Sequence, residues 1–267
     1  MFAFGNLLRW RPASFWWVVP AWLMGCERWD LPRSPVNLSE GLVAYFPFDG
    51  TPLDASGNHL NGQLLNGATY GPDRADKAAS ALLLDGVDDY FELPDNALLR
   101  PTTALSVSLW LRARAVTSTS HVFNKSTYAD HQNQQYSALL RPPYAIGDGK
   151  GPGVELLFDL NQDGSCAPEL PLKQFVSYYD PLFQAARWYH FVAVFSGTTG
   201  KIYVNGEVKR TETSLPNAPV DACPGGSLRF GAQAAVDLNP FGGSLDEIRV
   251  YNRALTDAEV DALFRQP

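Results

Sequence analysis

The chain has 267 residues, of which 45% are hydrophobic, and a formal net charge of −7. This length provides for one large β domain or two small ones. The acidic balance and the lack of a lysine or arginine cluster exclude nucleic acid as a partner, because binding to a phosphate backbone requires clustered positive charge.

Residues 1–25 have the layout of a secretory signal peptide. Arg9 and Arg11 precede the apolar run "PASFWWVVPAWLMG", and no acidic residue lies among them. The run is too short to cross a bilayer as a stable helix, whereas a basic segment followed by a short apolar run directs export. We therefore expect residues 1–25 to be removed from an exported protein.

The apolar run ends in "LMGC", which resembles the lipobox of bacterial lipoproteins. The resemblance implies that Cys26 becomes the first residue and carries lipid, which anchors the protein to the cell envelope. Glu27 after it, rather than Asp, favours the outer membrane where the cell has one. The alternative is an ordinary signal peptide with an incidental Cys26. Residues 26–40 are rich in Pro, Ser and Asn, and we expect them to form a tether.

From Gly41 onward, short apolar stretches alternate with Gly, Asn, Asp and Pro, a pattern typical of strands and turns. Asn205-Gly206 predicts a β-hairpin, since these residues accept the positive φ angles of a type I′ turn. The predicted strands are "GLVAYFPF" (41–48), "LSVSLWLRA" (105–113), "YSALLR" (136–141), "GVELLFDL" (153–160), "RWYHFVAVF" (187–195), "KIYVNGEVK" (201–209) and "SLRFGA" (227–232).

One helix is predicted, at the C-terminus. Thr256 and Glu259 have the spacing of a capping box, and Val260, Leu263 and Phe264 form an apolar stripe. Many strands followed by one helix predict an all-β fold, a two-sheet antiparallel β-sandwich over residues 41–267 with a short C-terminal helix.

A family resemblance is carried by "GLVAYFPFDG" with "DASGNHLNGQLLNGATY", then "ALLLDGVDDYFELPD", "ALSVSLWLRA", "RWYHFVAVFSGTTGKIYVNGEV" and "GSLDEIRVYNRALTDAEVDALF". They resemble the laminin G-like, concanavalin A-like jelly-roll domains of bacterial surface proteins, in order from Gly41 to Phe264. Residues 128–182 depart from the family pattern, because they are longer and less regular. The resemblance implies a jelly roll, but this fold serves lectins, adhesion modules and glycanases alike.

Two cysteines remain after Cys26. In an exported protein Cys166 and Cys223 are expected to form a disulfide, because the compartment is oxidising. The alternative is a pair of buried free thiols.

A first calcium site follows from the resemblance. Because side chains alternate along a strand, we expect Asp246 in "GSLDEIRVYNRAL" to share a face with Ile248, where an unpaired carboxylate is costly. Members of the superfamily often hold a structural Ca²⁺ between the start of the domain and its last strand. The resemblance implies Asp49 and Asp246 as ligands, with Asn58 or the carbonyls of residues 59–62. Oxygen ligands of this kind suit calcium. Alternatively, Asp49 forms a turn and Asp246 caps backbone amides.

A second calcium site follows from spacing. "DLNQDG" matches the first half of a calcium-binding loop, and Asp159, Asn161 and Asp163 would supply its side-chain ligands. The final glutamate of such a loop is replaced by Leu170. An ordinary turn rich in Asp and Asn explains the segment equally well.

Candidate ligand-binding residues lie in the atypical middle segment, where a shared scaffold would differ to create a function. Aromatic side chains stack on sugar rings, and polar side chains bind the hydroxyls. These residues are Tyr128, Tyr136, Arg141, Tyr144, Tyr178 and Tyr179. The alternative is that the tyrosines only cover longer loops.

No catalytic constellation is evident. Laminarinase-type glycanases carry E-x-D-x-E on one strand, and no two glutamates here are four residues apart. His190 lies in an apolar strand and is expected to be a core histidine. We therefore expect a lipid-anchored, extracytoplasmic binding module for a glycan or a cell-surface protein, with calcium as a structural ion. The alternatives are a glycan hydrolase or lyase with an unfamiliar site, and a structural or adhesion domain of the cell envelope.

Overall fold

The computed structural model describes Met1 and residues 36–126, 134–142, 153–166, 173–233 and 239–266. All described strands and helices belong to the unit Val36–Pro267. Within these ranges, no helix is long and apolar enough to cross a membrane. The predicted signal peptide, Cys26 and the tether up to residue 35 lie outside the described residues.

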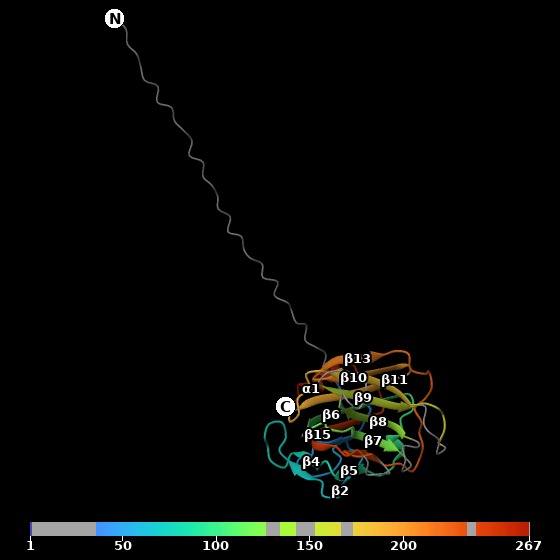
Figure 1. Cartoon of the computed structure of the whole chain (residues 1–267). Helices are drawn as coiled ribbons and strands as arrows, with labels where there is room; N and C mark the ends of the chain where they lie inside the picture. Colours follow the sequence, from blue (N-terminus) through green and yellow to red (C-terminus); the bar gives the residue numbers. More distant parts are fainter. Residues whose placement is uncertain (2–35, 127–133, 143–152, 167–172, 234–238, 267) are drawn as a thin grey trace. The chain divides into compact units, whose positions relative to one another are not determined.

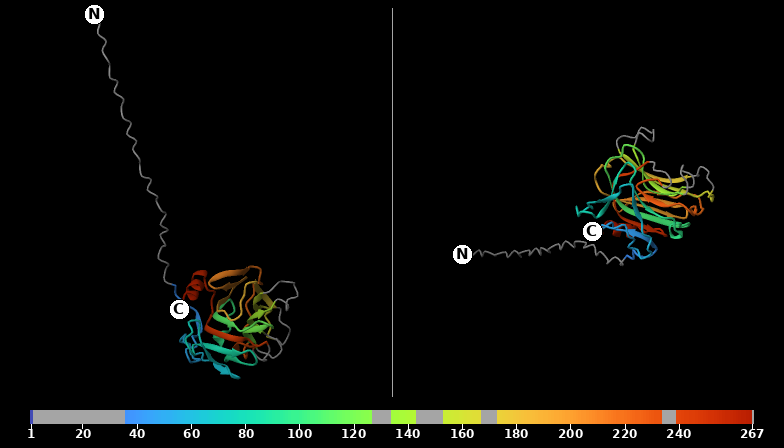
Figure 2. Two further views of the ribbon diagram at one scale, coloured as in Figure 1. Left: turned by 60° about the vertical axis from the view of Figure 1, so that its left-hand side comes forward. Right: turned by 90° about the horizontal axis from the view of Figure 1, so that it is seen from below.

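Two antiparallel sheets form the domain (Figures 1 and 2). Sheet A has the order β13-β12-β11-β6-β15-β4-β3, with β1 paired to β15, and sheet B has the order β10-β9-β8-β7-β14-β5-β2. The strands of sheet A are β1 (Leu42–Phe46), β3 (Thr69–Gly71), β4 (Ala81–Asp85), β6 (Ala104–Ala113), β11 (Tyr189–Ser196), β12 (Thr199–Val204), β13 (Glu207–Glu212) and β15 (Gly242–Tyr251). Those of sheet B are β2 (Gln63–Leu65), β5 (Tyr90–Leu93), β7 (Ser120–Ser126), β8 (Gln134–Arg141), β9 (Val154–Asn161), β10 (Lys173–Asp180) and β14 (Leu228–Phe230).

The core lies between the two sheets and is supplied by alternate residues of each strand. In β6, Leu105, Val107, Leu109 and Leu111 are fully buried in it, and β9 contributes Phe158 in the same way. Period-two alternation of apolar residues is the signal from which the strands were predicted. The predicted two-sheet β-sandwich is confirmed.

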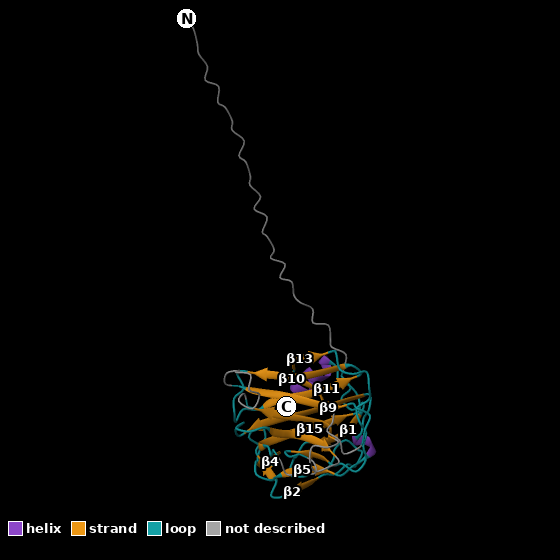
Figure 3. Ribbon diagram, turned by 45° about the vertical axis from the view of Figure 1, so that its right-hand side comes forward, coloured by secondary structure: helices purple, strands orange, loops and turns teal. Residues whose placement is uncertain are grey.

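Helices are few in the described domain (Figure 3): a short 3-10 helix, η1 (Ala97–Leu99), and the predicted C-terminal helix α1 (Asp257–Phe264). The capping box of α1 is present, with Thr256 and Glu259 each bonding the other's backbone amide. Val260 and Leu263 pack on Val192 and Tyr203, which project from the outer face of sheet A. The helix therefore buries part of that face.

The predicted hairpin joins β12 and β13 through Asn205-Gly206, both with positive φ. A Cβ atom at Gly206 would lie 2.9 Å from Cδ1 of Phe264, so only glycine fits the turn against the end of α1.

The predicted disulfide between Cys166 and Cys223 is also confirmed, with Cα atoms 5.5 Å apart and a sequence separation of 57 residues. It links the residues after β9 to the segment that leads into β14.

The expected face of Asp246 is wrong because β15 contains a bulge. Its pairing with β6 shifts between Asp246 and Arg249, and Glu247 has φ of +52°. Leu245 and Ile248 therefore both enter the core, while Asp246 pairs with Trp110 on the outer face of sheet A. One inserted residue reverses the alternation on which the expectation depended.

Candidate functional site

A row of polar side chains crosses sheet B on the face turned away from the core. Strand pairing aligns Glu92, Arg229, Asn124, Ser137 and Asp159 across five adjacent strands. Their strand neighbours are core residues, such as Phe91, Phe230, Ala138 and Phe158. Burial of polar groups is costly unless they form hydrogen bonds. We therefore expect the side chains of this row to have partners.

The row is connected by hydrogen bonds and ion pairs. Arg229 Nε donates to Glu92 Oε2 over 2.7 Å, and Gln134 Nε2 donates to Asp159 Oδ2 over 3.4 Å. The Ser137 hydroxyl also donates to Asp159 Oδ2, over 3.5 Å. The carboxylate of Asp159 is thus fixed by donors from β8.

A cavity of about 230 Å³ lies on this face and is named here the face cavity. Arg141, one of the predicted ligand-binding residues, contributes to it and lies 3.6 Å from Glu155 as an ion pair (Nε to Oε2). Its described lining residues are Thr119, His121, Gln134, Leu139, Arg141, Leu157, Asp159 and Asn239.

Glu155 was not singled out from the sequence. It lies four residues before Asp159 on the same side of β9, and its Oε2 has no hydrogen-bond partner among the described residues. The search for paired glutamates overlooked this mixed Glu–Asp pair, although its spacing is visible in "VELLFDLN". A row containing Leu139 and Leu157 separates the two carboxylates.

The largest of the described cavities, about 480 Å³, lies where the edge strands β10 and β13 meet, beside the end of α1. It is named here the edge cavity. It contains Tyr178, another predicted ligand-binding residue, together with two further aromatic rings. Its described lining residues are Tyr178, Asp180, Leu182, Arg187, Tyr189, Val204, Asn205, Glu207, Lys209 and Phe264.

The lining of the edge cavity has two acidic and two basic side chains, and one ion pair is formed between them among the described residues. Lys209 Nζ lies 2.6 Å from Glu207 Oε2, and this contact raises the pKa of Lys209. Among the described residues, Arg187 has no ion-pair partner, and the carboxylate of Asp180 accepts a bond only from the backbone amide of Leu182. A guanidinium and a carboxylate therefore remain available for a ligand.

Aromatic rings supply the apolar part of the edge cavity. Burial, followed by the charge of Asp180, raises the pKa of Tyr178, so its hydroxyl stays protonated and can donate. Tyr189 stacks on Phe183 with ring centres 4.6 Å apart, and the Arg187 guanidinium lies 5.8 Å from its ring centre. Asn205 Oδ1 accepts from the amide of His190, which fixes the side chain that faces the cavity.

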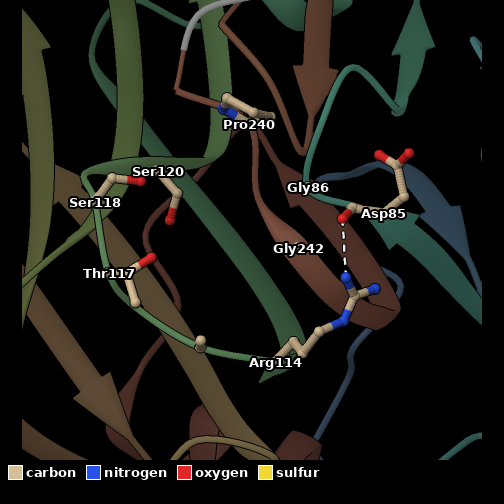
Figure 4. A pocket seen from close by; sticks show the side chains of 9 residues that line it. Asp85, Gly86, Arg114, Thr117, Ser118, Ser120, Pro240 and Gly242 are labelled. Atoms are coloured by element: carbon tan, nitrogen blue, oxygen red, sulfur yellow. Dashed lines mark hydrogen bonds between the residues drawn. The ribbon is translucent and has the colours of Figure 1, made fainter.

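A third, smaller cavity of about 160 Å³ is lined mainly by hydroxyl groups and backbone (Figure 4). Thr117, Ser118 and Ser120 contribute the hydroxyls. Arg114 Nη1 donates to the carbonyl of Asp85 over 2.9 Å, so this guanidinium is already engaged with backbone.

The two carboxylates of the first predicted calcium site each contact a basic side chain. Lys77 pairs with Asp49 at the surface, and Arg74 Nη1 lies 3.3 Å from Asp246 Oδ2. Burial, then the charge of Glu247, raises the pKa of Asp246 to about 7. Asn58 donates from Nδ2 to the carbonyls of Leu42 and Val43. A calcium ion at this place stays a prediction.

The predicted loop at Asp159–Gly164 is wrong in its first half. Asp159 and Asn161 belong to the extended strand β9, so their side chains are spaced along one face and do not converge. Asp163 follows the strand, and its carboxylate contacts that of Asp221, a residue that sequence spacing could not connect to it.

The remaining predicted ligand-binding residues lie in different environments or outside the described residues. Tyr136 is 1% exposed, and its hydroxyl donates to the carbonyl of Leu99, so its assignment to a binding surface is wrong. Tyr179 pairs with Glu155 on the outer face of sheet B and is partly exposed. Tyr128 and Tyr144 lie outside the described residues.

A family model described as the concanavalin A-like lectin/glucanases superfamily matches residues 85–261. No curated protein sequence matches the chain.

Several solved structures share the fold. Domain 4 of AbnA, a GH43 extracellular arabinanase from Geobacillus stearothermophilus, in complex with arabinotriose, has 23% identity and a TM-score of 0.60, over 84% of this chain and 98% of that one. The binding domain of Paraclostridial Mosquitocidal Protein 1 has 17% identity and a TM-score of 0.63, over 85% and 52%. The ligand binding domain of botulinum neurotoxin serotype D, in complex with N-acetylneuraminic acid, has 12% identity and a TM-score of 0.60, over 85% and 51%. The chain therefore corresponds to about half of each toxin domain.

Proposed function

This chain belongs to the concanavalin A-like lectin/glucanases superfamily, and from that membership we propose that it is a glycan-binding module whose ligand site is the edge cavity. The relatives support a binding role. One was solved with arabinotriose and another with N-acetylneuraminic acid, and the former corresponds to this domain over nearly its whole length.

The observation that carries the proposal is the composition of the edge cavity. Tyr178, Tyr189 and Phe264 provide aromatic surface, while Asp180 and Arg187 provide an acceptor and donors that no described ion pair occupies. Sugar rings combine an apolar face with hydroxyls that both donate and accept, so such a lining is complementary to them. Two acids and two bases in the lining favour a neutral sugar over an anionic one.

A panel of neutral and anionic saccharides, including arabinotriose and N-acetylneuraminic acid, tests the proposal by titration calorimetry. We expect a neutral oligosaccharide to bind and Tyr178→Ala to weaken its affinity by roughly tenfold or more, since exposed tyrosines are frequent binding hot spots. Arg187→Ala should weaken it as well. If no member of the panel binds, the proposal fails and a structural or adhesion role is favoured.

Matched variants control for changes in stability. Tyr70, like Tyr178, is partly buried against the main core, but it lies on β3 outside the edge cavity. Arg210 is an exposed arginine on β13 that pairs with Glu212. Tyr70→Ala and Arg210→Ala should leave the affinity unchanged.

Hydrolysis is a second candidate function, favoured by Glu155 and Asp159 on one side of β9 next to the face cavity. Glycosidases use two carboxylates on either side of the scissile bond. Release of reducing ends from the same polysaccharides, abolished by both Glu155→Gln and Asp159→Asn, would establish it. We expect no release, because Arg141 pairs with Glu155 and Ser137 donates to Asp159, so both carboxylates already have partners.

The sequence of residues 1–40 bears on where in the cell the protein acts. We propose that the module is exported and held at the cell envelope by lipid on Cys26, with the following residues as a tether. A lipid anchor would present the edge cavity to glycans outside the cell.

A further inference from the structure

One short segment of the chain, residues 180–187, supplies three kinds of contact to the edge cavity. Asp180 ends β10, Leu182 follows it, and Arg187 lies shortly before β11. Asp180 provides a carboxylate, Arg187 a guanidinium and Leu182 an apolar side chain. An acceptor, several donors and an apolar surface therefore come from a single connection between two strands.

Backbone and aromatic contacts hold this segment in place. Leu182 N donates to Asp180 Oδ1 over 2.9 Å, so the two residues lie side by side. The rings of Phe183 and Tyr189 stack with centres 4.6 Å apart, and the amide of Gln184 donates to the Tyr189 hydroxyl over 2.9 Å. A site that is fixed before its ligand arrives loses less conformational entropy on binding. The segment is therefore suited to recognise one chemical group in a defined orientation.

The two charged groups of the segment are not paired with each other. Within the described part of the chain, Arg187 forms no ion pair, and the Asp180 carboxylate accepts only from the amide of Leu182. A carboxylate only accepts hydrogen bonds, and a guanidinium only donates them. A ligand group that contacts both must therefore present a donor to one and an acceptor to the other.

Leu182 adds an apolar requirement. Its side chain lines the cavity and is 79% exposed, so a bound ligand can cover it. Covering apolar surface with another apolar group is favourable, whereas a hydroxyl placed there loses hydrogen bonds to water. The segment therefore favours a ligand that carries an apolar group beside its donor and its acceptor.

We propose that the edge cavity recognises the acetamido group of an N-acetylhexosamine, which defines the class of neutral glycan that it binds. This inference rests on the proposed glycan-binding function. An uncharged acetamido group has an N–H donor for Asp180, a carbonyl acceptor for Arg187 and a methyl group for Leu182. The sugar ring lies against Tyr178. Hydroxyl groups of the sugar also bond to the carboxylate and the guanidinium, since each forms several hydrogen bonds.

Calorimetric titration of the protein with triacetylchitotriose and with cellotriose tests the proposal. These neutral trisaccharides differ only in the acetamido group that replaces one hydroxyl on each ring. We expect triacetylchitotriose to bind roughly tenfold more tightly. Leu182→Ala should weaken its affinity by roughly threefold or more and leave that of cellotriose unchanged, because only the acetamido methyl contacts this side chain. Leu53→Ala, at an exposed leucine outside the edge cavity, should change neither affinity.

Asp180→Asn tests the contact between donor and acceptor. The asparagine oxygen can still accept from the amide of Leu182, but the new nitrogen donates and cannot accept from the acetamido N–H. The affinity for triacetylchitotriose should therefore fall by roughly tenfold. A hydroxyl both donates and accepts, so the affinity for cellotriose should fall less.

The outcomes separate this inference from the function on which it rests. The inference is overturned if cellotriose binds as tightly as triacetylchitotriose, or if either variant leaves the affinity for triacetylchitotriose unchanged. It is also overturned if a variant weakens both trisaccharides equally. If neither trisaccharide binds while another neutral saccharide of the panel does, the inference fails and the glycan-binding function stands. If no saccharide binds at all, that function fails as well.

Discussion

Asp246 and Asp49 each form an ion pair with a basic side chain, but the two pairs differ in burial. Arg74 and Asp246 are both largely buried, with side chains 15% and 4% exposed, and Arg74 also lies over the ring of Trp110 at 4.5 Å from its centre. Lys77 and Asp49 are more than half exposed. Buried charges depend on their partners far more than solvated ones do.

We therefore predict that Arg74→Ala lowers the free energy of unfolding by roughly 3–5 kcal/mol at a pH well above the pKa of Asp246, about 7, because it leaves the ionised carboxylate buried without its cation. Lys77→Ala, the matched surface change, should have little or no effect. Urea denaturation of both variants measures the difference. Equal destabilisation by the two changes would contradict this assignment of the buried pair.

The face on which Asp246 lies could not be predicted from the sequence, because it depends on the bulge in β15. Alternation along "GSLDEIRVY" predicts that Asp246 and Ile248 share one face of the strand. No residue type in the segment indicates the bulge. Glu247 accepts positive φ there while its carboxylate accepts a bond from Tyr45 over 2.9 Å. Such a bulge follows from contacts with β1 and β6, which a single segment does not contain.

At the scale of elements, we predict that the disulfide contributes to the stability of the fold. Cys166 and Cys223 close a loop that includes β10 to β13. In the chain-entropy model, removal of this cross-link by Cys166→Ser with Cys223→Ser costs roughly 3–5 kcal/mol of stability.

Chemical denaturation of the double variant against the oxidised wild type measures that loss. The wild type treated with reductant serves as the control and should behave like the double variant. Unchanged stability in both would show that the cross-link contributes nothing to the fold.

Strands were predicted where the segment is mainly apolar, and β7 shows how a buried strand can be missed. β6 alternates Leu and Val with Ser, β11 is apolar on both faces, and both were predicted. β7 was not, because its sequence "SHVFNKS" is entirely buried although most of it is polar. Asn124 of β7 belongs to the polar row on sheet B, and polar residues of this kind hide the apolar pattern from which strands are predicted.

The edge cavity could be predicted only in part for a similar reason. Tyr178 was singled out because it lies in the atypical middle segment. Arg187, Asn205, Lys209 and Phe264 come from other elements and meet it only because β10 and β13 are edge strands of opposite sheets. Pairing of the sheet edges is a property of the whole sandwich, so no local pattern reveals it.

At the scale of the whole molecule, the account depends on export. If Cys26 carries lipid, the wild type should partition with the membrane fraction, and Cys26→Ser should release the protein in soluble form. Cell fractionation with immunoblotting measures this. A Cys26→Ser protein that stays with the membrane fraction would contradict the lipid anchor but would leave the glycan-binding proposal untouched.

The central claim is that the edge cavity binds a neutral glycan. Its most direct test is a crystal structure of the domain with the neutral oligosaccharide that binds best in the panel. We predict a sugar ring against Tyr178, with its hydroxyls bonded to Asp180 and Arg187. A sugar seated instead in the face cavity, beside Arg141 and Asp159, would contradict the claim.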